Sequence, residues 1–236
     1  VYALQKMSLL MEKQHNRGQD GAGLACVKLD MPPGKPYINR IRNNSATPII
    51  DTFNQAFAPL HELKNAQSPR YLDLDYLKEN VDFTGEVFLG HLRYGTFGKN
   101  NIKYVHPFIR PNNWKTRNLI LAGNFNMTNA EELFQKLIQM GQHPVETADT
   151  VTIMEQIGYY LDEENDMLYQ RYKAEGMPRV EISEHIANEL NIPNILRKSC
   201  TMWDGGYVLS GMVGNGDAFV MRDPNGIRPA FYYAND

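Results

Sequence analysis

The sequence has few cysteines, no long apolar run and no excess of positive charge. Its 236 residues include two cysteines, Cys26 and Cys200, which form neither a disulfide framework nor the paired spacing of a metal site. We interpret both as core residues, Cys26 in a strand and Cys200 on a helix. Since this cysteine usage fits a reducing compartment, we expect a cytoplasmic protein. No apolar stretch approaches the roughly 20 residues of a membrane helix, and a net charge of −3 argues against nucleic acid as a partner.

Composition and length are those of an ordinary globular protein. Hydrophobic residues make up 42% of the chain and charged residues 22%, so a sizeable core can be buried. The apolar periodicity predicts helices at residues 1–15, 51–63, 72–79, 129–140, 151–161, 182–190 and 195–203. Strands are predicted at residues 24–27, 37–41, 86–91, 119–122, 206–213, 218–222 and 230–233. We expect Pro59 to interrupt the second helix, residues 162–171 to be a polar connection and residues 99–118 a surface connection.

Three glycines fall within the eight residues Asn16–Gly23, directly before the first predicted strand. This density of glycine indicates a tight turn or a close approach of neighbouring backbone. Arg17, Gly18 and Asp20 belong to the turn, and we interpret them as structural support. Arg17 is expected to bind carbonyl oxygens that hold the turn rather than a substrate.

The stretch Leu119–Phe134 reads as a short strand, an interruption at Gly123-Asn124 and a helix. Thr128 is the expected N-cap of that helix, with Glu131 three residues on as in a capping box. A strand that stops here can present a backbone N–H and an amide side chain to developing negative charge. An ordinary strand–loop–helix connection explains the same residues, so the stretch alone leaves both interpretations open.

Two charged residues have the chemistry to recognise the ends of an amino acid. Arg93 lies in the predicted loop His91–Gly98, and its planar guanidinium matches a carboxylate two-to-two. A surface ion pair is the alternative for Arg93. Asp149 precedes a predicted helix, where its carboxylate is either an N-cap or the partner of an ammonium group. His91 itself is interpreted as a core histidine.

Four segments carry a family resemblance. In chain order they are NRGQDGAG at Asn16–Gly23, GHLRYGTFG at Gly90–Gly98, LAGNFNMTN at Leu121–Asn129 and RDPNGIRP at Arg222–Pro229. Together they resemble the glutaminase domain of the class II glutamine amidotransferases. The RGQD and DPNGIRP forms are similar to the amidophosphoribosyltransferase branch of that family. Each motif alone is weakly specific, whereas four in the family order are a strong signal; residues 30–82 match poorly.

The resemblance implies an α+β fold, the N-terminal-nucleophile hydrolase fold, in which two mostly antiparallel sheets and flanking helices form a four-layer αββα sandwich. It implies one glutaminase domain over residues 1–236, without its extreme N-terminus, and a phosphoribosyltransferase domain outside this chain. In the family the nucleophile is a cysteine at the mature amino terminus, whose own α-amine is the base. Because the chain begins with Val1 and Cys26 follows the RGQD turn, we expect the nucleophile to be absent and this chain to be inactive as given.

The resemblance also assigns an oxyanion site. Asn124 matches the asparagine whose side-chain amide stabilises the tetrahedral oxyanion. The second donor, a backbone N–H, falls on Phe125. The family has histidine and glycine where this chain has Gly123 and Phe125, and phenylalanine lacks the backbone freedom of glycine.

The two ends of glutamine are assigned in the same way. Arg93 matches the arginine that binds the α-carboxylate, with Tyr94 and Thr96 on the same loop. Asp149 matches the acid that pairs with the α-ammonium group. No metal ligand is expected in this domain.

The function implied is hydrolysis of glutamine to glutamate and ammonia, with ammonia passing through a channel to phosphoribosyl pyrophosphate in purine synthesis. The partners implied are glutamine, the protein's own C-terminal phosphoribosyltransferase domain and further copies in a homo-oligomer. No cofactor is expected here, magnesium is expected in the phosphoribosyltransferase domain, and two separated cysteines cannot hold an iron–sulfur cluster. The alternatives are a non-catalytic amino-acid-binding or regulatory domain on the same fold, and another branch of the family.

Overall fold

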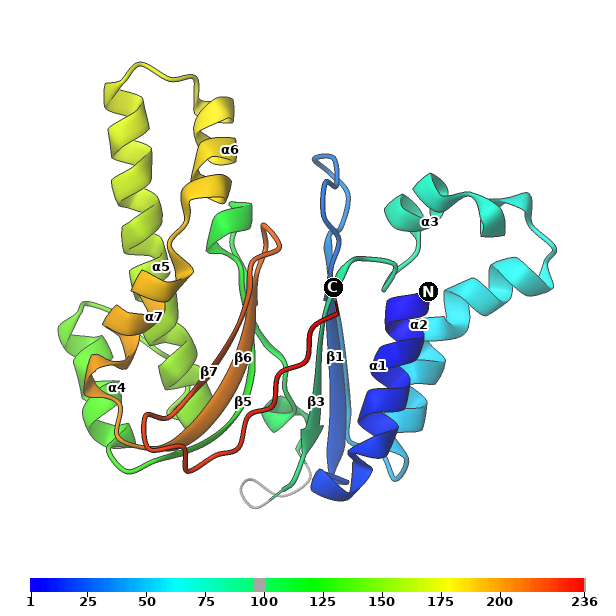
Figure 1. Cartoon of the computed structure of the whole chain (residues 1–236), viewed down its shortest axis with the longest axis horizontal. Coiled ribbons are helices and arrows are strands. Elements are labelled where there is room, and N and C mark those ends of the chain that lie inside the picture. The colour runs from blue at the N-terminus through cyan, green and yellow to red at the C-terminus, as the bar shows by residue number, and fades with distance from the viewer. Residues whose placement is uncertain (96–100, 236) are drawn as a thin grey trace. The chain divides into compact units, whose positions relative to one another are not determined.

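The computed structural model describes residues 1–95 and 101–235 (Figure 1). The chain divides into two compact units, unit 1 with residues 1–108 and unit 2 with residues 109–236. Each unit contains an antiparallel sheet and helices, so the predicted α+β class with two antiparallel sheets is confirmed. No helix in the described part of the chain combines the length and the apolar character needed to cross a membrane.

Unit 1 is built on a three-stranded sheet with strand order β2-β1-β3. Its strands are β1 (Gly21–Val27), β2 (Ile38–Asn43) and β3 (Val87–Arg93). All seven residues of β1 are buried, and its neighbours are antiparallel, with Leu24 opposite Ile41 on one side and Gly90 on the other. Burial on both faces explains why this strand reads as a continuous run of small and apolar residues instead of an alternation.

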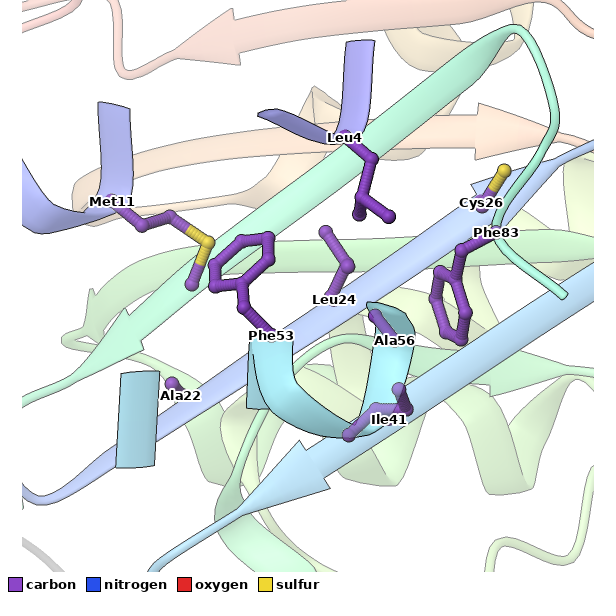
Figure 2. Close-up of a cluster of buried hydrophobic side chains, with 9 residues drawn as sticks. All are labelled: Leu4, Met11, Ala22, Leu24, Cys26, Ile41, Phe53, Ala56 and Phe83. Atoms are coloured by element: carbon purple, nitrogen blue, oxygen red, sulfur yellow. The ribbon is translucent and has the colours of Figure 1, made fainter. Parts of the chain in front are cut away.

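Three helices belong to unit 1: α1 (Tyr2–Lys13), α2 (Pro48–Asn65) and α3 (Leu74–Asn80). On α1, Leu4 and Met11 are seven residues apart and therefore share one face, which packs on the sheet. On α2, Phe53 and Ala56 are three residues apart and also share a face, which packs into the same core. The resulting core cluster, shown in Figure 2, contains Leu4, Met11, Ala22, Leu24, Cys26, Ile41, Phe53, Ala56 and Phe83.

Helix α2 continues through Pro59, so the expected interruption is wrong. Proline costs one helical hydrogen bond, but Ala56 and Leu60 on either side of it are both buried. Leu60 packs with Leu77 and Val81 in a second small cluster. Tertiary packing on both sides of the proline therefore keeps the helix continuous.

Unit 2 contains a four-stranded sheet with order β4-β5-β6-β7. The strands are β4 (Phe108–Arg110), which starts at the unit boundary, β5 (Leu119–Met127), β6 (Gly205–Val213) and β7 (Ala218–Arg222). The helices are α4 (Ala130–Gln139), α5 (Asp149–Ala174), α6 (Arg179–Glu189) and α7 (Ile192–Ser199). Of these, α4, α5 and α7 lie on the same side of the sheet (Figure 1). The strands predicted at residues 206–213 and 218–222 are confirmed as β6 and β7, which pair as an antiparallel hairpin.

Helix α5 is more than twice as long as predicted, because the expected polar connection at residues 162–171 is helical. Its acids are paired with arginines that precede β5: Asp162 lies 2.6 Å from Arg110 and Asp166 lies 2.5 Å from Arg117. The amide of Asn165 is fully buried and donates to the Thr116 carbonyl at 3.2 Å. Polar partners distant in sequence thus stabilise as helix the segment 162–171, which its sequence alone predicts to be a solvent-exposed connection.

Two further expectations are wrong. Residues 230–233 form no strand, and the side chains of Phe231, Tyr232 and Tyr233 are 94%, 90% and 86% exposed. No strand in the described ranges pairs with this segment, so its β propensity is unused. Residues 101–118, the described part of the expected surface connection, are not all at the surface: they contain β4 and the buried residues Val105 and Asn118. Asn118 is buried because its side-chain amide donates to backbone carbonyls of the loop before it.

Candidate functional site

In unit 1 the glycine-rich turn is joined to the end of β3 through Asp20. The Asp20 N–H donates to the Arg93 carbonyl at 3.0 Å. The Asp20 carboxylate accepts from the Gly95 N–H at 2.7 Å. These two bonds lie on either side of Tyr94, so the carboxylate and backbone of one residue hold the start of the loop that follows Arg93.

Gly18 allows this contact because it lies against the backbone of β3. A Cβ atom at Gly18 would be 2.7 Å from the carbonyl carbons of Leu92 and Arg93, which leaves no room for a side chain. Arg17 is exposed, and no hydrogen bond from its guanidinium to a carbonyl occurs within residues 1–95 and 101–235. The contacts that join this turn to β3 come from Gly18 and Asp20, and a supporting role of Arg17 stays a prediction.

Arg93 is the last residue of β3 and is 5% exposed. The prediction placed it in a loop, but its backbone is paired with Gly21 of β1. The alternative of a surface ion pair is wrong, because the side chain is buried. Its guanidinium carbon lies 5.9 Å from the ring centre of Tyr104, while neighbouring Tyr94 is 70% exposed. Thr96 lies outside the described residues.

Two histidines that the sequence did not single out for a site lie near Arg93. The rings of His91 and His106 stack at 4.3 Å, and His106 is buried. Burial lowers the pKa of His106 well below its ordinary value of 6.5, and the nearby His91, Arg93 and Arg42 lower it further. His106 is therefore neutral near pH 7, and Arg93 and Arg42 are the cations near it. The Asp20 carboxylate, bonded to the Gly95 N–H, also lies near the Arg93 guanidinium.

In unit 2, β5 runs without interruption through Gly123 and Asn124 to Met127, so the expected break is wrong. The physical reason is that β6 supplies a partner for every residue, with Asn124 opposite Val208 and Asn126 opposite Gly206. The side chains of Asn124 and Asn126 are exposed on one face of the sheet.

Phe125 lies on the opposite face of β5 and is half-buried. Its ring packs on Gly123, where an added Cβ atom would be 2.7 Å from the ring carbon Cζ. The absence of a side chain at Gly123 therefore makes space for the ring of Phe125.

The helix after β5 starts differently from the prediction. Thr128 is not its N-cap; the Thr128 hydroxyl bonds the Asp204 carboxylate instead. The N-cap of α4 is Asn129, whose side-chain amide donates to the Met202 carbonyl at 2.8 Å, and Glu131 accepts from Gln135. The expected capping box is therefore absent, because both of its members have tertiary or helical partners.

Asp149 is the first residue of α5 and is half-buried. The N-cap position belongs to Ala148, and the Asp149 side chain makes no capping bond. The N-cap alternative is therefore wrong, and pairing with an ammonium group stays a prediction. Among the described residues no hydrogen bond joins Asp149 to Asn124.

The last motif forms a loop around a buried carboxylate. Asp223 is 1% exposed and accepts from the backbone N–H groups of Ile227 at 2.8 Å, Arg228 at 3.0 Å and Tyr207 at 3.3 Å. Burial raises the pKa of Asp223, but these N–H groups outweigh it and leave the pKa below its ordinary value. Asp223 therefore fixes the backbone of Ile227 and Arg228 against the start of β6.

Neither cysteine has the environment of a nucleophile. Cys26 is fully buried in β1, and burial raises the pKa of its thiol to about 12. Cys200 is half-buried at the start of the 3-10 turn η5 (Cys200–Met202), and burial raises the pKa of its thiol too. A nucleophilic cysteine needs a lowered pKa. Within the described ranges no group of three or more His, Cys, Asp or Glu side chains is arranged to hold a metal ion.

Known proteins with similar sequences were compared with this chain. No protein-family model matches the sequence. The chain is 24% identical over 217 residues to the amidophosphoribosyltransferase of Pasteurella multocida, covering 92% of this chain and 33% of the relative. It is 26% identical over 148 residues to that of Methanothermobacter thermautotrophicus, covering 63% and 25%. The chain thus spans a quarter to a third of the length of these relatives.

Solved structures agree in fold. The chain is similar to the glutamine phosphoribosylpyrophosphate amidotransferase of B. subtilis complexed with ADP and GMP, with a TM-score of 0.58 and 21% identity over 96% of this chain and 36% of that one. A structure described as the allosteric regulatory enzyme of purine biosynthesis gives a TM-score of 0.59 at the same identity and coverage.

The sequence likeness and the fold together support a glutamine amidotransferase-like domain, as the resemblance predicted. Within that class, the chain is similar to the amidophosphoribosyltransferases.

Proposed function

We propose that this chain is the glutaminase part of an amidophosphoribosyltransferase-like enzyme, which hydrolyses glutamine to glutamate and ammonia. The observation that carries the proposal is the sequence likeness to amidophosphoribosyltransferases over 92% of the chain. The buried Arg93, held at the end of β3 beside the Asp20 turn, supports it.

Each charged group has a role in holding the amino acid. Arg93 binds the α-carboxylate, since its fork of N–H donors matches two carboxylate oxygens. Tyr94 and Thr96 follow Arg93 in the chain and contact the same substrate. Asp149 pairs with the α-ammonium group.

The reaction is two acyl transfers. A cysteine thiolate attacks the side-chain amide carbon of glutamine, the oxyanion collapses, and ammonia leaves with a proton to give a thioester. Water then hydrolyses the thioester to glutamate and regenerates the thiol. Asn124 and the backbone N–H of Phe125 stabilise the oxyanion in both steps.

The nucleophile proposed is a cysteine at a processed amino terminus, because Cys26 and Cys200 have raised pKa values and a buried or half-buried position. The ammonia acceptor proposed is phosphoribosyl pyrophosphate, bound with magnesium in a phosphoribosyltransferase domain of the intact protein and reached through an ammonia channel. This acceptor is inferred from the named relatives.

The test is glutamine hydrolysis by the intact protein and labelling by a diazoketone analogue of glutamine. We expect turnover, and one label on an amino-terminal cysteine. The Cys26→Ala and Cys200→Ala variants serve as matched controls and should hydrolyse and label like the wild type. Absence of both turnover and label from protein with a correctly processed amino terminus would refute the proposal.

One observation favours a second candidate, a non-catalytic amino-acid-binding domain. Asn124 and Phe125 lie in a regularly paired strand and not in a loop, which differs from the geometry expected of an oxyanion site. Calorimetry distinguishes the two candidates: the second predicts that the intact protein binds glutamine but releases no ammonia.

A further inference from the structure

Arg228 carries a buried donor for which the described residues provide no acceptor. Its Nε atom is inaccessible to solvent and has no hydrogen-bond partner among the described residues. Buried polar atoms are paired in the great majority of cases, so an orphaned guanidinium donor calls for an explanation. A missing ligand is one such explanation.

The nearby carboxylate of Asp223 forms no ion pair with this guanidinium within the described residues. Asp223 accepts from the backbone N–H groups of Ile227, Arg228 and Tyr207, and these bonds occupy its oxygens. The backbone of Arg228 is therefore fixed against β6, while its Nε is left without an acceptor among the described residues. A pinned backbone also reduces the entropy lost when the side chain binds.

The strand register places Arg228 on the face that carries Asn124. A Cβ atom at Gly206 would be 3.7 Å from Arg228 Nε, so the guanidinium covers the side-chain position of Gly206. Gly206 is directly opposite Asn126, and directly opposite residues share a face. Asn124 is two residues along the same strand and thus on that face, roughly 7 Å further on.

We propose that Arg228 is a further substrate-binding residue, whose guanidinium binds negative charge at the side-chain end of the amino acid next to Asn124. This inference rests on the proposed glutaminase function and deepens it. The charge concerned is the oxyanion formed on glutamine and, after hydrolysis, the γ-carboxylate of glutamate.

The experiment measures inhibition of glutamine hydrolysis in the intact protein by two amino acids. L-Glutamate carries a side-chain carboxylate and L-norleucine carries an apolar side chain, while their α-groups are identical. Arg228→Gln should raise the inhibition constant of glutamate by about tenfold or more, as expected for a lost charged hydrogen bond. The constant for norleucine should stay within about twofold.

Two variants complete the design. Arg228→Lys keeps the charge and should restore part of the affinity for glutamate. Arg197→Gln removes one charge from an exposed position on α7, which packs beside Phe219 and Met221 on the other face of the sheet, and should change neither constant. Thermal unfolding of each variant verifies that it is folded.

An unchanged glutamate constant in folded Arg228→Gln overturns the inference and leaves the glutaminase proposal intact. Equal weakening of both inhibitors also overturns it, because it shows a structural role for Arg228. A wild-type protein that neither hydrolyses glutamine nor is inhibited by either compound overturns the proposed function itself.

Discussion

Arg93 is a cation buried at a strand end, where its backbone and its side chain serve different partners. The Arg93 carbonyl accepts from Asp20, and its guanidinium lies near Tyr104. We expect Arg93→Lys, which keeps the charge but loses the bidentate fork, to raise the KM for glutamine by about tenfold or more. Steady-state kinetics of the intact protein measure this effect.

The matched control is Arg17→Lys in the neighbouring motif, which changes an exposed arginine and should leave KM unchanged. If Arg93→Lys lowers the melting temperature strongly and leaves KM as it is, Arg93 is a structural residue and not a substrate ligand.

His106 makes the stability of unit 1 depend on pH. Burial first, and then His91, Arg93 and Arg42, lower its pKa in the folded state below 6.5. The unfolded chain therefore binds a proton that the native state excludes, and the free energy of unfolding falls as the pH drops below 6.5. The slope from this one group is at most about 1.4 kcal/mol per pH unit.

Denaturant unfolding between pH 5 and pH 7.5 measures this dependence. His106→Gln should flatten the curve below pH 6.5, while His143→Gln, at an exposed position, should leave it unchanged. The same slope in His106→Gln as in the wild type would show that other groups cause the pH dependence.

Helix α5 is the element whose length depends most on tertiary partners. Asp162 bonds Arg110 at 2.6 Å and is 29% exposed, and Arg110 also bonds Glu155 at 3.1 Å. Removing this acid leaves a half-buried guanidinium short of a partner. Asp162→Ala should therefore lower the free energy of unfolding by about 1.5–3 kcal/mol.

Glu163, the next residue, offers a matched control. It pairs with Lys198 at 3.1 Å, but both side chains are more than 40% exposed. Glu163→Ala should cost less than about 1 kcal/mol. Equal losses in the two variants, measured by urea unfolding, would contradict the importance of the Arg110 network.

Strand β5 carries the residues proposed to stabilise the oxyanion. Asn124→Ala should lower kcat by an amount equivalent to about 2.7–4 kcal/mol of barrier, with little change in glutamine binding. Asn126→Ala removes another exposed amide two residues along the same face of β5 and is the matched control, which should leave kcat unchanged. A normal kcat in Asn124→Ala would remove this residue from the oxyanion role.

At the scale of the whole molecule, each unit has its own sheet and buried side chains. Phe53 is part of the unit 1 core (Figure 2), and Leu133 is fully buried in unit 2. Phe53→Ala should cost about 3–5 kcal/mol and speed amide exchange in β1, leaving β5 and β6 protected. Leu133→Ala should do the reverse. Hydrogen exchange that rises equally in both sheets would show a single cooperative unit.

Much of the fold was predictable because local pattern and burial agree. The central strand of unit 1 was predicted at residues 24–27 and is found as β1, since burial on both faces produces a continuous apolar run. The face of α1 that contains Leu4 and Met11 follows from helical periodicity. The hairpin of β6 and β7 follows from the turn residues Gly214–Asp217.

The predictions failed where a partner distant in sequence overrides local preference. Gly123-Asn124 reads as an interruption, but Leu209 and Val208 of β6 pair with it and continue the strand. Asp162 and Asp166 read as a solvated connection, but Arg110 and Arg117 about 50 residues earlier hold them in a helix. The stacking of His91 on His106 had no local signal at all.

The candidate site shows the same division. The chemical identity of Arg93, Asn124 and Asp149 and the order of the four motifs were readable from the chain, and they indicated the class of protein. Their surroundings were not readable: the burial of Arg93, the regular pairing around Asn124 and the missing cap at Asp149.

The sequence by itself determined which chemical groups this protein carries and which local elements they prefer. Only the tertiary structure decided which of those groups are buried, neutral, paired or left with an open donor, as at His106, Asp223 and Arg228. The physical reason is that desolvation and hydrogen bonding depend on neighbours in space, whereas propensity and periodicity depend on neighbours in the chain.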